Sequence, residues 1–109
     1  MTEVTIFTNS ESSYLGFKVS GHSGFAEEGE DIICAAISML TITTVNSIEY
    51  LTETEISATE SERNAVIKAE FPDGCDDKAK LLVESFILGM EMIQSTYGKE
   101  YLTINFKEV

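Results

Sequence analysis

The sequence predicts one α+β domain over residues 1–109, with two helices on a mostly antiparallel sheet in the order ββαββαβ. Three observations support this fold class. Two pairs of short apolar stretches, each pair joined by polar or turn-forming residues, indicate two β-hairpins. A long uncharged segment follows the first pair, an amphipathic segment follows the second, and both have helical length. At 109 residues and 43% hydrophobic content, the chain can bury a core without disulfide or metal staples.

The first predicted hairpin joins residues 3–8 to residues 14–20. In its second strand Leu15, Phe17 and Val19 alternate with polar or small neighbours, which is the period of a half-buried strand. Residues 9–13 have the sequence Asn-Ser-Glu-Ser-Ser, which is typical of a turn. We therefore expect two antiparallel strands here.

The first predicted helix runs from about residue 31 to about residue 52. No charged residue occurs from Ile32 through Ile48, a stretch of 17 residues rich in Thr, Ser and Ala. This stretch is too short and too polar to be expected as a membrane span, and too apolar for a helix with one face in water. We expect the sheet to cover one side of this helix and a second helix or a partner subunit to cover another.

A second hairpin is predicted at residues 55–60 and 64–71. Apolar side chains alternate through its second strand, at Ala65, Ile67, Ala69 and Phe71. The turn signal Pro-Asp-Gly at residues 72–74 then separates this hairpin from the next element.

The second predicted helix opens at Asp76 or Asp77 and ends near Tyr97, with Gly98 as the residue that follows it. Its apolar residues recur every three or four positions and define one buried face: Ala79, Leu82, Val83, Phe86, Met90, Ile93 and Tyr97. Residues 101–107 form the last predicted strand, with Leu102, Ile104 and Phe106 on one face.

The net charge of −12 bears on the kind of partner the chain can have. Residues 1–62 contain eleven acidic residues and one basic residue, Lys18. A surface of this sign repels nucleic acid and anionic lipid and attracts basic proteins, although solubility alone would also explain it. The first sixteen residues show no signal-peptide pattern, and two cysteines suit reduced thiols, so a cytoplasmic location is expected.

The candidate active site lies between the first hairpin and the first helix. A glycine-rich acidic loop separates His22, the sole histidine, from Cys34 near the start of the helix. A thiol within reach of an imidazole is sufficient for nucleophilic catalysis, and a helix N-terminus favours a thiolate. The alternatives are an inert core thiol at Cys34 and a surface histidine at His22. The three glycines of residues 21–30 also suggest a loop that moves when substrate binds.

Three further residues near Cys34 have two possible roles each. Asp31 is expected as the N-cap of the helix, but it could instead orient His22 as the third member of a triad. Ser38 and Thr41 follow Cys34 by four and seven residues, and they either line a wet groove or bond back to the helix backbone. The sequence leaves both questions open.

A metal or cofactor is not expected. The spacing of His22, Asp31 and Cys34 matches no common ligand pattern, although the acidic loop with this histidine and cysteine could in principle hold an ion. No cofactor-binding motif is present. Cys75 is followed by two aspartates, which raise the pKa of a thiol, so we expect it to be structural or incidental.

The motif around Cys34 resembles that of the ribosomal-processing cysteine protease family, Prp. The family shows a Gly-His-small loop, then a Gly-x-Asp-Ile-[Val/Ile]-Cys-Ala start of a helix, and later a Val-Asn-small-Ile segment. Here these correspond to Gly21-His22, to Gly29 through Ser38 and to Val45-Asn46-Ser47-Ile48. Length and element order also match, so the resemblance covers the whole domain.

The resemblance implies a cysteine endopeptidase without a cofactor. Its catalytic residues would be Cys34 and His22, supported by Gly21, Asp31 and Ser38, and backbone N–H groups of Cys34 or Ala35 would bind the oxyanion. The family removes a short N-terminal extension, ending in paired aromatic residues, from a large-subunit ribosomal protein, and its members form homodimers. Two other functions remain open: an acidic adaptor that binds a basic ribosomal segment, and a small thiol-dependent acyltransferase or thioesterase.

Overall fold

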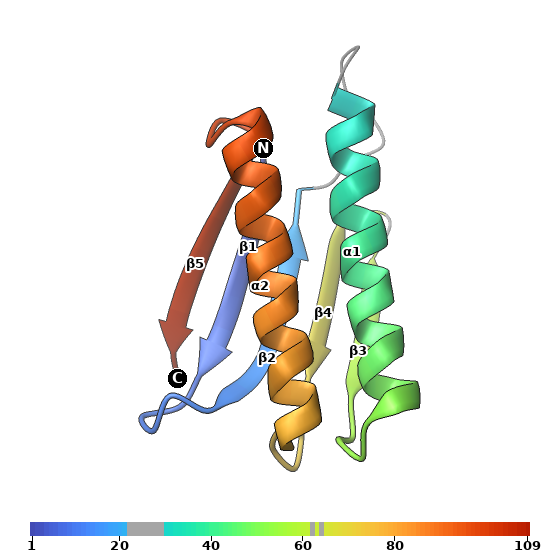
Figure 1. Ribbon diagram of the computed structural model, residues 1–109, viewed down its shortest axis with the longest axis vertical. Coiled ribbons are helices and arrows are strands. Elements are labelled where there is room, and N and C mark those ends of the chain that lie inside the picture. Colours follow the sequence, from blue (N-terminus) through green and yellow to red (C-terminus); the bar gives the residue numbers. More distant parts are fainter. Residues whose placement is uncertain (22–29, 62, 64) are drawn as a thin grey trace.

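Two helices cover one face of a five-stranded sheet in the computed structural model (Figure 1). The structure describes residues 1–21, 30–61, 63 and 65–109. Within them, the elements follow in the predicted order ββαββαβ, and the strands lie side by side in the order β3-β4-β2-β1-β5. The α+β fold class predicted from the sequence is therefore confirmed.

Both predicted hairpins are present, and a parallel pair completes the sheet. The first hairpin pairs β1 with β2 and the second pairs β3 with β4, while β2 also pairs antiparallel with β4. The last strand, β5, lies parallel to β1. The strands span Thr2–Thr8 (β1), Tyr14–Ser20 (β2), Ser57–Ser61 (β3), Val66–Glu70 (β4) and Leu102–Glu108 (β5).

The two helices run antiparallel and pack against each other over the sheet (Figure 1). Helix α1 spans Glu30–Leu51 and α2 spans Asp77–Tyr97. A Cβ atom added at Gly89 of α2 would lie 2.6 Å from Leu40 of α1, so the glycine allows the helices to approach closely. The second helix thus covers part of the uncharged first helix, which is one of the two covers expected from the sequence.

The core lies between the sheet and the helices. Phe17 is fully buried there, and its ring packs 4.6 Å from that of Phe86, centroid to centroid. The other described apolar residues without exposed surface alternate along the strands or recur at helical spacing: Val4, Ile6, Val19, Ile37, Ile48, Ala69, Ala79, Val83, Met90 and Leu102. Most of the residues predicted to face the core are therefore buried.

Tyr97 and Phe106 were predicted on the apolar faces of their elements and are exposed, by 41% and 61%. Figure 1 shows the reason for Phe106: α2 crosses the sheet obliquely and does not cover the far end of β5. Tyr97 is the last residue of α2, where the chain turns into β5. A side chain can thus lie on the apolar face of its strand or helix and still be exposed, where no neighbouring element packs against that face.

The outer side of α1 is apolar and uncovered. Ile32, Met39 and Tyr50 are each more than 60% exposed. Contrary to the expectation from the sequence, residues Ile32–Leu51 are long and apolar enough to cross a membrane by length and composition. Core helices pass the same test, and α1 buries Ile33, Ile37, Thr41, Thr44 and Ile48 within the protein. We therefore treat α1 as a packed helix with one apolar side unpartnered in the monomer.

Candidate active site

Cys34 is the fifth residue of α1 and is half-buried. The helix begins at Glu30, so Asp31 belongs to its first turn and is not the N-cap that the sequence suggested. Only the first four N–H groups of a helix lack partners within it. Counted from the residue before Glu30, the free donors among the described residues are those of residues 30–32, and the N–H groups of Cys34 and Ala35, expected to bind the oxyanion, are used within the helix.

Gly21 fixes the chain immediately before His22. Its N–H donates to the carbonyl oxygen of Ala65 at 2.9 Å, which ties the end of β2 to the start of β4. Its φ of 88° lies in the left-handed region, and an added Cβ would approach the carbonyl oxygen of Met1 to 2.5 Å. A side chain cannot fit here without moving backbone. Met1 and Ala65 are distant in sequence, and nothing in the sequence signalled their contacts with Gly21.

His22 and the loop to Gly29 lie outside the described residues, and so does the side chain of Asp31. The end of β2, which leads into His22, and the start of α1, which carries Cys34, lie at the same end of the molecule (Figure 1). The fold therefore brings the segment that leads into His22 and the helix start that carries Cys34 to the same end of the molecule. The predicted movement of residues 21–30 falls on the same loop and stays a prediction.

Ser38 and Thr41 behave differently although both follow Cys34 at helical spacing. The hydroxyl of Thr41 is buried and donates to the carbonyl oxygen of Ile37 at 2.7 Å. Thr44 and Thr52 bond back in the same way, to Leu40 and Ile48. Thr41 is thus a satisfied core residue and does not line a wet groove, whereas Ser38 is only half-buried and lies closer to Cys34.

The second cysteine lies at the opposite end of the molecule. Cys75 is half-buried directly before Asp76, the N-cap of α2. Burial raises the pKa of its thiol, and the neighbouring Asp76 carboxylate raises it further. Its Sγ lies 3.6 Å from the carbonyl oxygen of Asp76. These contacts agree with the structural or incidental role that the sequence predicted for Cys75.

Hydrogen bonds of Asp76 connect the chain just after the end of α1 to the start of α2. Its carboxylate accepts from the N–H of Ala79 at 2.8 Å and from the N–H of Glu53 at 3.0 Å. Its own N–H donates to the hydroxyl of Thr54 at 2.8 Å. The bond from Ala79 makes the largest contribution to lowering the pKa of this carboxyl. The N-cap residue Asp76 thus ties the two helices together at the end of the molecule that carries Cys75.

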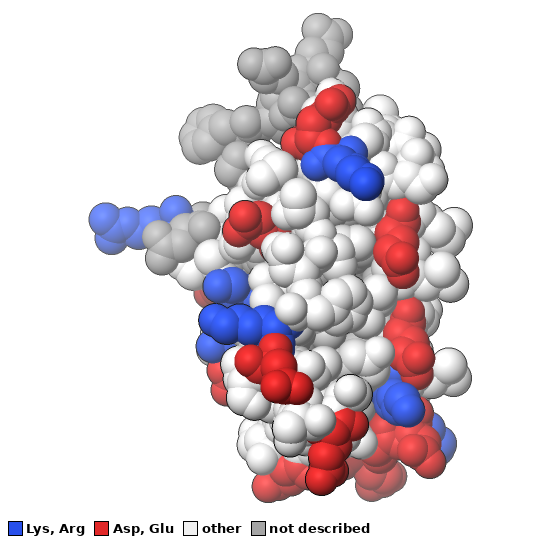
Figure 2. Space-filling model, turned by 90° about the vertical axis from the view of Figure 1, so that its left-hand side faces the viewer, with Lys and Arg blue, Asp and Glu red and all other residues white. Residues whose placement is uncertain are grey.

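Acidic residues gather at this end, which lies at the bottom of Figure 2. Glu55 hydrogen-bonds to Asp73, which raises the pKa of Glu55. Among the residues that the structure describes, no three His, Cys, Asp or Glu side chains are grouped to hold a metal ion. The acidic loop 22–29 lies outside those residues, so the expected absence of a metal stays a prediction.

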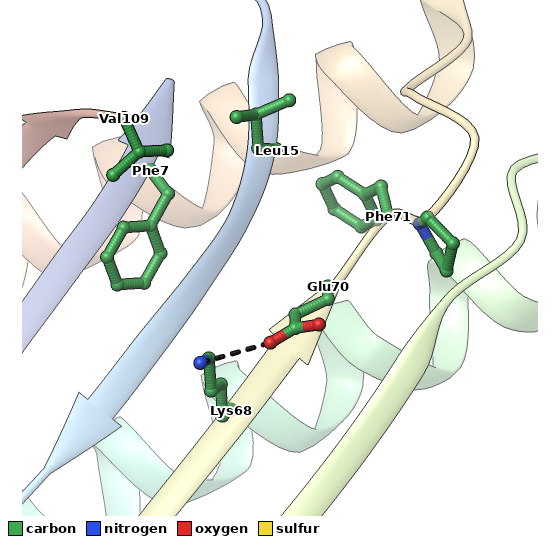
Figure 3. Close-up of a pocket in the computed structure, with 7 residues that line it drawn as sticks. Phe7, Leu15, Lys68, Glu70, Phe71 and Val109 are labelled. Carbon is green, nitrogen blue, oxygen red and sulfur yellow. Dashed lines mark ion pairs between the residues drawn. The ribbon is translucent and has the colours of Figure 1, made fainter. Parts of the chain in front are cut away.

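A hollow on the open face of the sheet lies away from Cys34 (Figure 3). Its volume is about 380 Å³, and Phe7, Phe71 and Pro72 contribute to its lining. Lys68 pairs with Glu70 at 3.0 Å beside it, and the Lys68 ammonium lies 6.0 Å from the centroid of the Phe7 ring. Figure 3 looks onto the face that the helices leave open, so this hollow is separated from Cys34 by the sheet.

Comparison with known proteins places the motif in a family. The sequence profile described as cysteine protease Prp matches residues 1–102. The ribosomal processing cysteine protease Prp of Bacillus subtilis is 32% identical over 101 residues, which cover 89% of this chain and 90% of that protein.

Two solved structures of Staphylococcus aureus have the same fold. The essential ribosomal processing protease Prp with a substrate peptide superimposes with a TM-score of 0.89 at 25% identity, covering 98% of this chain and 100% of that one. The same protease with a covalently linked product peptide gives a TM-score of 0.86 at 26% identity and the same coverage. The profile match over almost the whole chain and the Bacillus relative establish the assignment: this chain belongs to the Prp family of cysteine proteases.

Proposed function

We propose that this chain is a ribosomal-processing endopeptidase that removes a short N-terminal extension, ending in paired aromatic residues, from a large-subunit ribosomal protein. The observation that carries the proposal is the family match across residues 1–102, with Cys34 half-buried near the start of α1. The names of the Bacillus and Staphylococcus relatives supply the ribosomal substrate class. We further propose that the protein works in the cytoplasm without a cofactor.

In the proposed mechanism, Cys34 is the nucleophile and His22 is the general base and acid. The Cys34 Sγ attacks the scissile carbonyl carbon while His22 holds the thiol proton. Collapse of the tetrahedral intermediate breaks the C–N bond, and His22 delivers the proton to the leaving amine. Water then attacks the thioester and releases the acyl group. The covalently linked product peptide in the Staphylococcus protease supports such an intermediate.

Backbone N–H groups of the first turn of α1 are the proposed oxyanion donors. With the helix starting at Glu30, the groups of residues 30–32 are available, and Ile32 lies two residues before the nucleophile. We propose supporting roles for three residues: Gly21 holds the chain that leads into His22, Asp31 orients the imidazole, and Ser38 contributes a hydroxyl one turn below Cys34. The contacts of Gly21 with Ala65 and Met1 support the first of these roles.

We also propose a homodimer in which α1 contacts a second copy. The exposed Ile32, Met39 and Tyr50 recur along one side of this helix, and exposed apolar side chains in a row are typical of interfaces. Sedimentation equilibrium at micromolar concentration should show the dimer, and Met39→Lys should weaken it. A wild-type monomer under these conditions would contradict this part of the proposal.

The net charge of −12 supports a basic protein as partner and disfavours nucleic acid or an anionic membrane. The negative surface would hold the basic body of a ribosomal protein near Cys34. We therefore expect kcat/KM for a full-length precursor to fall as salt rises, more than for an uncharged leader peptide.

Cleavage of a ribosomal protein precursor with an aromatic-ending leader tests the proposed function. We expect the wild-type protein to release the leader at a single site, as mapped by mass spectrometry, and Cys34→Ala and His22→Ala to be inactive yet folded. An acidic adaptor would bind the precursor without cleaving it. A thioesterase would hydrolyse a thioester and leave the peptide bond intact. Near wild-type cleavage by either variant would refute the dyad.

A further inference from the structure

A hollow of about 190 Å³ lies between α1 and the strands β3 and β4. Ile42 and Val45 of α1, Ala58 of β3 and Ile67 of β4 contribute its apolar lining. Ala58 pairs across the sheet with the buried Ala69, so its small side chain points to the helix-covered side and leaves the space open. Glu60 also lines the hollow and is exposed.

The hollow lies on the same side of α1 as Cys34. From Cys34 to Ser38, to Ile42 and to Val45 the steps are four, four and three residues, which keep these side chains on one side of a helix. The rise of a helix places Ile42 and Val45 about 12–16 Å from Cys34 along the axis. An extended peptide covers this distance in about four or five residues.

The edge strand β3 provides a path for such a peptide. Together with α1 it borders the hollow, and it forms one edge of the five-stranded sheet (Figure 1). Extended peptides commonly add to a sheet edge through main-chain hydrogen bonds, with alternate side chains entering pockets. A peptide laid along β3 would follow α1 between the hollow and the end of the helix that bears Cys34.

Building on the proposed function, we infer that this hollow is a specificity pocket for the substrate peptide. It takes one apolar side chain located four or five residues from the scissile bond. The volume suits this occupant, because an apolar cavity of about 150 Å³ holds a benzene molecule. The paired aromatic residues next to the cleavage site are too close to Cys34 to reach it.

Glu60 adds a preference for charge at this pocket. Its partner across the sheet is the buried Ile67, so Glu60 points to the same side of the sheet as the hollow. A basic residue next to the apolar one in the substrate would pair with this exposed carboxylate. Since the pair lies in solvent, it contributes to selection of the peptide more than to affinity.

Two peptides that share one cleavage site test the inference. The short peptide has three residues on each side of the scissile bond, and the long peptide has six, with apolar residues at the fourth and fifth positions. We expect the wild-type protein to cleave the long peptide with a KM about tenfold lower and a similar kcat. Equal values of kcat/KM for the two peptides would overturn the inference while leaving the proposed function intact.

Ala58→Phe should fill the hollow. It should raise the KM for the long peptide about tenfold, to the value for the short peptide, and leave kinetics with the short peptide unchanged. The matched control is Ser57→Phe, on the same strand but on the opposite face of the sheet. It should leave the kinetics with both peptides unchanged. An equal loss on both peptides would contradict a pocket distant from the bond being cleaved.

Binding gives a readout that does not depend on cleavage. In a Cys34→Ala background, fluorescence anisotropy of the labelled long peptide should show binding that Ala58→Phe weakens about tenfold. Ile42→Asn, at a site already 42% exposed, provides a second variant if Ala58→Phe does not fold, and should weaken binding several-fold. Unchanged binding by the folded variants would overturn the inference, and so would loss of the dimer in Ala58→Phe, because the hollow would then belong to a subunit contact.

Discussion

The two helices begin at opposite ends of the molecule, and a cysteine lies near each beginning (Figure 1). Cys34 is inside α1, past its first turn, and follows the acidic loop. Cys75 precedes α2 and contacts the carbonyl of the capping Asp76, and burial and this carboxylate raise the pKa of its thiol. A helix N-terminus therefore does not activate a thiol by itself. At Cys75, burial first and the cap carboxylate second favour the protonated thiol.

The largest difference between the two ends should appear when each thiol is removed. We expect Cys34→Ala to lower kcat/KM for leader cleavage by at least about 10³-fold, because the nucleophile is lost. Cys75→Ala should keep kcat/KM within about twofold, since its thiol is protonated and distant. Steady-state kinetics, with thermal unfolding as the check of folding, measure both. Equal losses in the two variants would remove the functional distinction between the ends.

The next largest effect on activity is expected from one member of a matched pair of glycines. Gly21 and Gly74 have φ of 88° and 89°, but only at Gly21 would an added Cβ meet backbone, whereas nothing lies within 4 Å of it at Gly74. Alanine at either position should destabilise the fold through its backbone conformation. Gly21→Ala should in addition lower kcat/KM about 10–100-fold, because it displaces the chain that leads into His22.

Stability and activity separate the two effects in this pair. Unfolding midpoints should fall in both glycine variants, while the leader-cleavage assay should show a loss for Gly21→Ala alone. A Gly21→Ala protein with unchanged kcat/KM would show that the close contact with Met1 does not position the histidine.

A smaller effect is expected when the charge of Asp31 is removed. Asp31 lies in the first turn of α1, three residues before Cys34. Asp31→Asn should lower kcat about three- to tenfold, since Asn keeps much of the shape but cannot stabilise an imidazolium. Rates from pH 5 to 9 measure it, and an unchanged profile would mean that Asp31 has no electrostatic part in the reaction.

The smallest effect on activity should come from the cap at the other end. Asp76→Ala should lower the unfolding midpoint by about 5 °C and leave kcat/KM unchanged, whereas Asp76→Asn should retain most of the stability. Because hydrogen bonds lower the pKa of Asp76, its charge stabilises the fold above the ordinary value of 3.8. That contribution disappears as the pH falls through the lowered pKa. A gap between wild type and Asp76→Asn that widens in acid would contradict this sign.

The sequence predicted the elements better than their arrangement. Alternation and capping located every strand and helix to within about two residues, because these signals are local. The parallel pairing of β5 with β1 and the position of β3 at the edge depend on contacts between distant segments, which periodicity does not encode. The exposure of Phe106 depends on where α2 crosses the sheet, and no local pattern specifies that crossing.

The candidate site shows the same division. The motif predicted Cys34, His22, Gly21, Asp31 and Ser38, while the role proposed for Gly21 rests on its contacts with Met1 and Ala65, which are far away in sequence. Thr41 carried the same signal as Ser38 and proved to be a core residue bonded to Ile37. Spacing places residues on one side of a helix but does not say what covers that side.

Covalent labelling is the most direct test of the claim that Cys34 alone is the nucleophile. The protein would be treated with a leader peptide ending in a chloromethyl ketone, and the modified residue mapped by mass spectrometry. We predict one adduct per chain, on Cys34, that free leader peptide slows and Cys34→Ala abolishes. Labelling of Cys75 at a comparable rate, or labelling of Cys34 that free leader peptide does not slow, would contradict the account.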